Sequence, residues 1–206
     1  MSKKNFHIDF KFTSISGFED SEYPNVDELF GKIFFNDNEK DIFVEAGKIE
    51  LHLYDFSFID YGFNLYDAFD RSFDTVKLGN AIFDYRTKRI KKKIENQIGL
   101  AYNLNILVIH DLMLFDEFRG KEYGVEIINE IEEVFNDKCG IIALQSFPKQ
   151  HDVSVKDTKD FQKFKLKTLD DNIVTAQKSL NKFYEKCGFV RIRGEKDCYI
   201  KNIAPA

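Results

Sequence analysis

Three units with short connections occupy residues 105–147, which read NILVIHDLMLFDEFRGKEYGVEIINEIEEVFNDKCGIIALQSF. Residues 105–115 are an apolar run, residues 121–135 carry apolar side chains at helical spacing, and residues 140–147 are a second apolar run. The pattern predicts a strand, a helix and a strand. Because a crossover helix brings the strands on either side of it parallel, we expect this helix to pack on a sheet.

The predicted helix has one apolar side and one polar side. Spacings of 3, 3 and 4 residues separate its apolar positions, which places them on one side of a helix. The apolar positions are Val125, Ile128, Ile131 and Phe135, and the polar ones are Glu126, Asn129, Glu130 and Glu133. The apolar side should therefore face the sheet.

The C-terminal part of the chain predicts a further helix and a hairpin. The helix covers residues 175–186 and ends at Gly188, where a residue without a Cβ can adopt the left-handed conformation of a helix C-terminus. Residues 189–193 and 197–201 then form the two arms of a closing hairpin around residues 194–196.

The N-terminal part offers strands first and helices later. Residues 29–35 and 41–56 are rich in Phe, Ile and Val and predict antiparallel strands, with turns at residues 36–38 and at Gly47. Alternation along the second of these strands places His52 on its more polar face. The chain after this strand is expected to be mostly helical.

The composition fits one globular domain of residues 1–206. With 43% hydrophobic and 15% aromatic residues, the chain has enough apolar material for a folded core. Three cysteines make an odd number without the close spacing of metal ligands, so the sequence predicts neither a disulfide framework nor a metal site.

The apolar runs and the charge narrow the range of partners. No run approaches the ~20 apolar residues that span a bilayer, and the first residues lack the apolar segment of a secretion signal, so we expect a cytoplasmic protein without a membrane partner. A net charge of -5 argues against a nucleic-acid partner. The same charge is compatible with a cationic amine substrate.

The turn that opens the helix of residues 121–135 is a candidate anion site. A helix N-terminus presents unpaired N–H groups and a partial positive charge, and a glycine in the turn lets a phosphate approach. Gly120 supplies the glycine, and Arg119 and Lys121 strengthen the positive field. Taken alone, an Arg-Gly-Lys turn is more often a solvated connection.

Two motifs together resemble a known family. Residues 112–124, LMLFDEFRGKEYG, are similar to the donor-binding motif of the GNAT acyltransferases, Arg/Gln-x-x-Gly-x-Gly/Ala after a strand, with the match starting at Arg119. Residues 179–189, SLNKFYEKCGF, resemble the second signature of that family, an aromatic residue followed by Tyr-Glu-Lys-x-Gly-Phe at the end of a helix. Both occur in the family's order, with the expected strand between them.

The resemblance implies an α/β (α+β) fold, a mixed central sheet flanked by helices, that binds acetyl-CoA or another acyl-CoA. In the family, a bulged strand splays from its parallel neighbour, the pantetheine pairs with the freed main chain, and turn amides hold the diphosphate. The donor-binding residues implied here are Leu112, Met113, Leu114, Arg119, Gly120, Lys121, Glu122, Tyr123, Gly124 and Val125. The recognisable core covers about residues 105–200.

The implied reaction is N-acetyl transfer by direct attack of a neutral primary amine on the thioester, and the acceptor is a small-molecule or protein amine. Tyr184 matches the family tyrosine that often protonates the departing thiolate. For the general base, His110 is the first candidate and Asp111 the second, because both end the strand that forms the thioester gap; His52 and Glu45 are further candidates.

The chain departs from the family pattern in three places. Glu122 stands where the family most often has a glycine, and Gln177 where it frequently has an asparagine. Residues 148–176 form an insertion that could cap the acceptor side, form a homodimer contact or be a plain surface helix. Because Glu122 adds negative charge beside a phosphate, the alternative is a non-catalytic GNAT-like module that binds CoA or a partner protein.

Two stretches between residues 54 and 98 have competing interpretations. Residues 65–98 are predicted to be helical with a break at residues 79–80, and the basic run 86–93 is a solvated helix face, a contact for RNA, or a contact for the 3'-phosphate of CoA. Residues 54–73 are either core or an aromatic and acidic wall for the acceptor. The carboxylates of that wall are Asp55, Asp60, Asp67 and Asp70.

Overall fold

The structure is a computed structural model that describes residues 6–14, 26–37, 42–56 and 64–203. Its strands are β1 Phe6–Ser14, β2 Val26–Asp37, β3 Ile42–Tyr54, β4 Phe83–Asp84, β5 Arg89–Ile90, β6 Ile106–Leu114, β7 Ile141–Gln145, β8 Val190–Arg191 and β9 Cys198–Asn202. Its α-helices are α1 Leu65–Phe69, α2 Phe73–Ile82, α3 Lys92–Ile98, α4 Tyr123–Phe135, α5 Lys159–Lys163 and α6 Ile173–Lys186. Short 3₁₀ turns cover Asp116–Phe118, Lys149–His151 and Leu166–Thr168.

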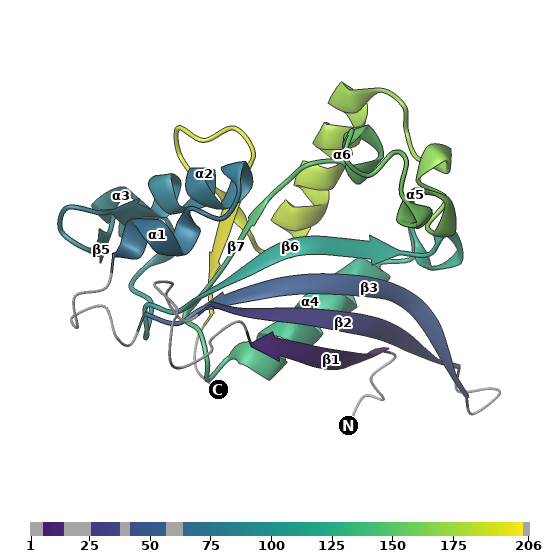
Figure 1. The fold of residues 1–206 in the computed structure, drawn as a ribbon, viewed down its shortest axis with the longest axis horizontal. Coiled ribbons are helices and arrows are strands. Elements are labelled where there is room, and N and C mark those ends of the chain that lie inside the picture. Colours follow the sequence, from purple (N-terminus) through teal and green to yellow (C-terminus); the bar gives the residue numbers. More distant parts are fainter. Residues whose placement is uncertain (1–5, 15–25, 38–41, 57–63, 204–206) are drawn as a thin grey trace.

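A mixed sheet of seven strands organises the fold, in the order β1-β2-β3-β6-β7-β9-β8 (Figure 1). Only β6 and β7 among its described pairs are parallel, and α4 connects them, as the sequence predicts for residues 105–147. The other pairs are antiparallel, and β4 and β5 form a separate two-stranded ribbon. The prediction of a mixed α+β sheet is therefore confirmed.

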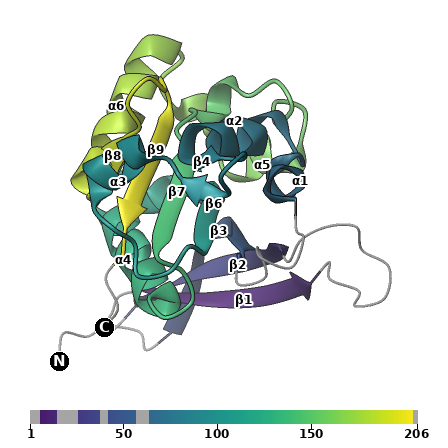
Figure 2. The same cartoon turned by 90° about the vertical axis from the view of Figure 1, so that its left-hand side faces the viewer.

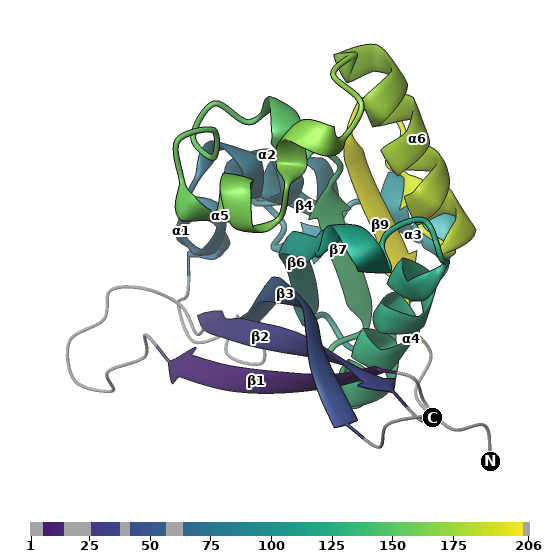
Figure 3. The same cartoon turned by 90° about the vertical axis from the view of Figure 1, so that its right-hand side faces the viewer.

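Helices cover both faces of the sheet, as Figures 2 and 3 show. Ile109 and Ile142 belong to the core cluster that includes residues of α4 and α6. Val108 and Ala143 belong to the cluster that includes residues of α1, α2 and α3. Because neighbouring residues of a strand point to opposite faces, α2 and α6 lie on opposite sides of β6 and β7.

The predicted helices of the second half are confirmed with small changes. Residues Ile127, Ile128, Ile131 and Phe135 of α4 are buried, so three of the four predicted apolar positions are fully in the core. Val125 is partly buried against the same cluster. After α6, Gly188 has φ +85, the left-handed conformation that the sequence predicts. The closing hairpin is also present, although β8 is only 2 residues long.

Gly47 does not form a turn, so this prediction is wrong. It lies inside β3, opposite Leu114 of β6, and a Cβ on it would lie 2.3 Å from the carbonyl oxygen of Met113. The glycine thus allows two strands to approach closely. The local sequence does not distinguish such a glycine from one in a turn. At the other predicted turn, Asn36 and Asp37 still belong to β2, and Asn38 lies outside the described residues.

The break at residues 79–80 is also wrong. Gly79 lies inside α2, where a Cβ would be 2.5 Å from Cγ of Phe69, so it permits α1 and α2 to pack. The helical region is instead interrupted at Ser72, which caps α2, and by the β4–β5 ribbon. In the part of the chain that the structure describes, no helix has the length and apolar character to cross a membrane.

Candidate functional site

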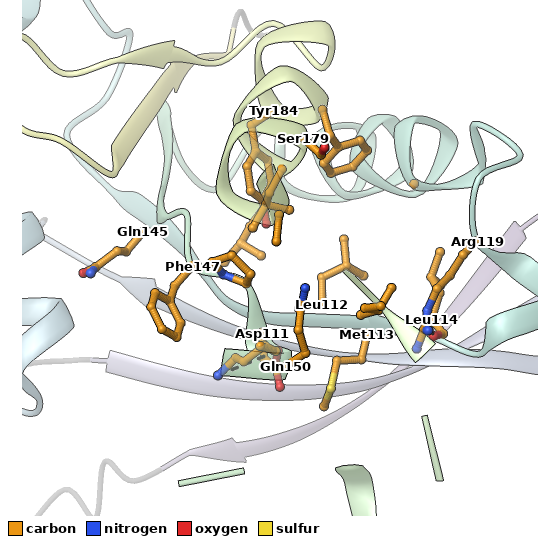
Figure 4. Close-up of a pocket in the computed structure, with 18 of the residues that line it drawn as sticks. Asp111, Leu112, Met113, Leu114, Arg119, Gln145, Phe147, Gln150, Ser179 and Tyr184 are labelled. Atoms are coloured by element: carbon orange, nitrogen blue, oxygen red, sulfur yellow. Dashed lines mark hydrogen bonds and ion pairs between the residues drawn. The ribbon is translucent and has the colours of Figure 1, made fainter. Parts of the chain in front are cut away.

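The strands β6 and β7 separate halfway along β6. Their pairing runs from Ile106 with Ile141 to Ile109 with Leu144, whereas β6 itself continues to Leu114. A cavity of about 660 Å³ lies at this divergence. In Figure 4, Tyr184 and Ser179 enter it from α6, across from Asp111 and Leu112 of β6.

The cavity passes through the sheet. Thr75 and Leu78 line it from α2, on one face, and Val125 and Phe183 line it from α4 and α6, on the other. A ligand could therefore enter from either face and meet a second ligand in the gap between the strands.

A β-bulge shapes the edge of this gap. Asp111 pairs with Glu50 and Ile109 pairs with Leu51, which leaves His110 as the extra residue of β6. A bulge bends its strand and redirects side chains. Both His110 and Asp111 line the cavity as a result.

The turn before α4 has the backbone shape of an anion site. Gly120 and Glu122 have φ +70 and +64, and no described side chain caps the start of α4, so its first amides are not engaged by a capping group. Gly120, Glu122, Gly124 and Val125 line the cavity, whereas Lys121 and Tyr123 are not among its lining residues. Gly124 also permits close packing, since a Cβ there would be 2.8 Å from the Phe183 ring.

Arg119 borders the cavity but is bonded to the protein. Its Nε donates to the carbonyl oxygen of Leu114 at 3.0 Å, and its Nη2 donates to that of Phe164. The guanidinium therefore ties the end of β6 to the 148–176 segment, instead of adding an uncommitted positive charge to the turn. The Leu114 carbonyl is also occupied, and the Met113 carbonyl lies against Gly47 of β3, which leaves Leu112 as the main-chain position of this strand end that faces the gap.

Glu122 is an exposed and ion-paired residue of this turn. Its side chain is 73% exposed and forms an ion pair with Lys186 of α6. A non-glycine residue in the left-handed region costs about 1 kcal/mol, and a negative charge near a phosphate opposes binding. A glycine at this position would avoid both effects.

We therefore expect Glu122→Gly to stabilise the fold by about 1 kcal/mol and to tighten binding of a diphosphate anion at this turn severalfold. Glu122→Gln separates the two causes, because it removes the charge but keeps the side chain at φ +64. Thermal unfolding with and without inorganic diphosphate measures both quantities. Equal Tm values for wild type and Glu122→Gly would contradict the strain argument.

Tyr184 lies on α6 at the wall of the cavity. It is 8% exposed and packs near the rings of Phe189 and Tyr199. Burial, followed by the negative charge of Asp111, raises the pKa of the Tyr184 hydroxyl above its ordinary value. The hydroxyl is therefore protonated at neutral pH, as a proton donor must be.

Asp111 is a largely buried carboxylate in the wall of the cavity. Its side chain is 11% exposed, its Oδ1 has no hydrogen-bond partner among the described residues, and the ammonium groups of Lys48 and Lys149 lie 4.0 Å away. Burial raises the pKa of Asp111, only partly opposed by these two lysines. A carboxylate with a raised pKa is a better proton acceptor than an ordinary one.

This raised pKa predicts a pH-dependent cost to stability. When the pKa of a carboxyl is higher in the folded state, its contribution is fully present below the unfolded pKa and is lost as pH rises through the folded pKa. We expect Asp111→Asn to raise the free energy of unfolding at pH 7 by about 1 kcal/mol, and to lose this advantage at acid pH. Thermal unfolding from pH 3 to pH 8 measures it; a constant difference would contradict the explanation.

The remaining base candidates do not border the cavity. His52 shares its face of β3 with Lys48 and Glu50, as the alternation predicts, and contacts Glu50 at 3.1 Å. It is nevertheless only 6% exposed and stacks on the ring of His110 with centroids 4.8 Å apart, because alternation does not show what covers each face. Glu45 forms an ion pair with Lys163 at 3.0 Å, and neither it nor His52 is among the described lining residues.

Residues 148–176 cap the cavity. Lys48 of β3 contacts Asp160 at 2.6 Å, and the Phe164 ring stacks on Phe115 with centroids 4.8 Å apart. Leu166 and Leu169 of this segment line the cavity. Its α5 is only 5 residues long, so the segment is a folded cap and not a plain surface helix.

The basic run 86–93 and the carboxylates of the proposed acceptor wall are not found among the described residues that line the cavity. The basic run spans the β4–β5 turn and the start of α3, and none of the described lining residues comes from it. Tyr54 and Phe69 stack in the core with centroids 4.5 Å apart, and neither Asp67 nor Asp70 is among the described lining residues. Asp60 lies outside the described residues.

Sequence reasoning missed the groups that complete the cavity. Asp74, Thr75 and Leu78 of α2 reach it, although they lie well before β6 in the chain.

Ser146 is held by Gln177 and Asn181, whose side chains bond it at 2.9 and 2.8 Å. The amide of Gln177, noted as a departure from the family, thus anchors α6 to the end of β7.

Compared with known proteins, the chain matches no protein-family model and no curated protein.

Proposed function

We propose that the chain is an acyl-CoA-dependent N-acetyltransferase of the GNAT type, which transfers an acetyl group from acetyl-CoA to a primary amine. The observation that supports this best is the cavity that passes through the sheet where β6 and β7 separate. Such a passage lets a thioester donor enter from the face of α4 and α6 while an amine enters from the face of α2.

The donor half contains groups suited to acetyl-CoA. The amides of residues 120–124 would hold the diphosphate at the start of α4, whereas the Val125 amide, also expected there, donates to the Glu122 carbonyl at 2.9 Å. The main chain of Leu112 would pair with the pantetheine, and Tyr184 would lie beside the sulfur. Lys182 of α6 also lines this half and adds positive charge, whereas Lys186 pairs with Glu122.

The acceptor half contains groups suited to an amine. The neutral amine attacks the thioester carbonyl carbon, the carbon–sulfur bond breaks, and the Tyr184 hydroxyl protonates the departing thiolate. His110 or Asp111 takes the proton that the ammonium form must lose before attack. The acceptor is a small-molecule or protein amine, and the charges of Asp74, Asp111 and Asp152 favour a cationic one.

Thermal unfolding with acetyl-CoA tests the donor half. At a concentration 100 times the Kd, binding to the native state adds about 2.7 kcal/mol, which raises Tm by about 5 to 10 °C in a chain of this size. Dephospho-CoA serves as the comparison that reports on the 3'-phosphate. No change in Tm with millimolar acetyl-CoA would count against every CoA-dependent function.

A non-catalytic module that binds CoA or a partner protein is the second candidate. The ion pair between Glu122 and Lys186 supports it, because it places a carboxylate beside the diphosphate turn. Acetyl-CoA turnover across a panel of primary amines separates the candidates. Binding of acetyl-CoA with no turnover of any amine would favour the module.

A further inference from the structure

A cluster of three titratable side chains adjoins the cavity at the bulge. His110 lines the cavity, the ring of His52 stacks on it with an interplanar angle of 12°, and Glu50 lies close to both. Oε1 of Glu50 is 3.1 Å from Nε2 of His52 and 4.0 Å from Nε2 of His110. The bulge creates this arrangement, because it turns His110 toward β3.

The hydrogen bond between Glu50 and His52 determines which ring nitrogen of His52 carries the proton. A carboxylate accepts hydrogen bonds, so Nε2 of His52 carries the proton and donates it. Nδ1 of His52 is buried without a hydrogen-bond partner in the described part of the chain, so a proton placed there would have no acceptor. His52 therefore holds the Glu50 carboxylate in place and leaves its charge facing His110.

Glu50 also connects the cluster to solvent. Its side chain is 27% exposed and that of His52 only 8%, whereas the 30% exposed side chain of His110 lines the cavity. The charged and titratable groups that face His110 are Glu50 and His52 from β3, Asp111 from β6 and Lys149 from the turn after β7. Of these, Glu50 and His52 lie outside the described cavity lining, and Glu50 is the more exposed of the two, so it is suited to pass a proton between the cavity wall and water.

We propose that Glu50 is the proton outlet of His110 and that His52 is the positioning residue that holds Glu50 for this role. This inference rests on the proposed acetyl transfer. An amine that arrives as an ammonium ion must lose one proton before its lone pair can attack. That proton forms a bond to His110, passes to Glu50 through one water, since their side chains are 4.0 Å apart, and leaves to solvent.

The second amine proton balances the rest of the reaction. It leaves the tetrahedral intermediate as the carbon–sulfur bond breaks and replaces the proton that Tyr184 gives to sulfur. The net products are an amide, CoA thiol and one proton released to solvent.

The charges of the cluster let Glu50 pass a proton on to water without retaining it. The hydrogen bond from His52 lowers the pKa of Glu50, so its carboxylate is ionised at neutral pH. Burial lowers the pKa of His110, and the Glu50 charge opposes that effect. Removing the Glu50 charge must therefore lower the pKa of His110 further.

Histidine NMR titration of the whole chain tests this coupling without an acceptor. The chain has only 4 histidines, so single substitutions assign their resonances. In Glu50→Gln, the titration midpoint of His110 should move to lower pH. Glu45→Gln is the matched control, since Glu45 lies on the same strand and pairs with Lys163 instead. Equal His110 midpoints in wild type and Glu50→Gln would overturn the proposal.

Turnover completes the test. With the best amine of the panel, Glu50→Gln should lower kcat about tenfold or more at pH 7. The acidic limb of the kcat–pH profile of Glu50→Gln should move to lower pH, while the Tm shift with acetyl-CoA stays unchanged. Glu50→Asp should restore part of the activity. If Glu50→Gln has the same turnover and pH profile as the wild type, Glu50 is not the proton outlet of His110. Loss of the acetyl-CoA Tm shift in the wild type would instead reject the acetyltransferase itself.

Discussion

Replacing Tyr184 with phenylalanine should lower turnover by about 10²- to 10⁴-fold and leave acetyl-CoA binding unchanged. The ring contacts with Phe189 and Tyr199 do not involve the hydroxyl, so the helix and cavity wall should keep their shape. The substitution removes only the hydroxyl that we propose as the proton donor to the thiolate. Acetyl-CoA turnover and the acetyl-CoA Tm shift measure the two quantities on the same preparation.

Tyr199→Phe is the matched control for this substitution. Tyr199 is also a buried tyrosine of the same core, and its hydroxyl lacks a hydrogen-bond partner among the described residues. It is not among the described cavity residues, so loss of its hydroxyl should leave turnover near the wild-type value. If Tyr184→Phe turns over the amine as fast as wild type across pH, Tyr184 is not the acid.

Gly47→Ala should give the largest loss of stability, about 3 kcal/mol, or a fall in Tm of about 6 to 12 °C. The new methyl would lie 2.3 Å from the carbonyl oxygen of Met113, a backbone atom, so β3 and β6 would have to move apart. The shift would also displace Met113 and Leu114 at the cavity edge. Thermal and urea unfolding measure the loss.

Gly194→Ala provides the comparison. Gly194 has φ +87, and no atom of the described residues lies within 4 Å of the place a Cβ would take, so alanine there should cost only the left-handed strain of about 1 kcal/mol. If Gly47→Ala lowers the free energy of unfolding by no more than Gly194→Ala does, then β3 and β6 can move apart at Met113 at little cost.

Much of the site was predictable because its parts are local. The strand, turn and helix of residues 105–135 carry their own periodicity, so β6, the turn and α4 follow from short-range pattern. Tyr184 and Gly188 belong to one helix end and are equally local. Whether these residues bind acyl-CoA stays a prediction.

The glycines show why other predictions failed. A glycine next to polar or charged residues predicts a turn or a break, but Gly47 and Gly79 serve contacts with Met113 and Phe69, which belong to other elements. The polar face of His52 was predictable, but its burial and its stacking on His110 were not, because they depend on strand pairing. Arg119 was expected to face an anion, yet its partners are carbonyl oxygens of Leu114 and Phe164.

The sequence by itself determined the order of strands and helices around the turn, since hydrophobic periodicity and helix-end signals depend on neighbours along the chain. Only the tertiary structure decided that β6 bulges at His110 and separates from β7, and that α2 and residues 148–176 enclose the resulting cavity. These features depend on strand register and on contacts between segments far apart in sequence, and no local pattern encodes such contacts.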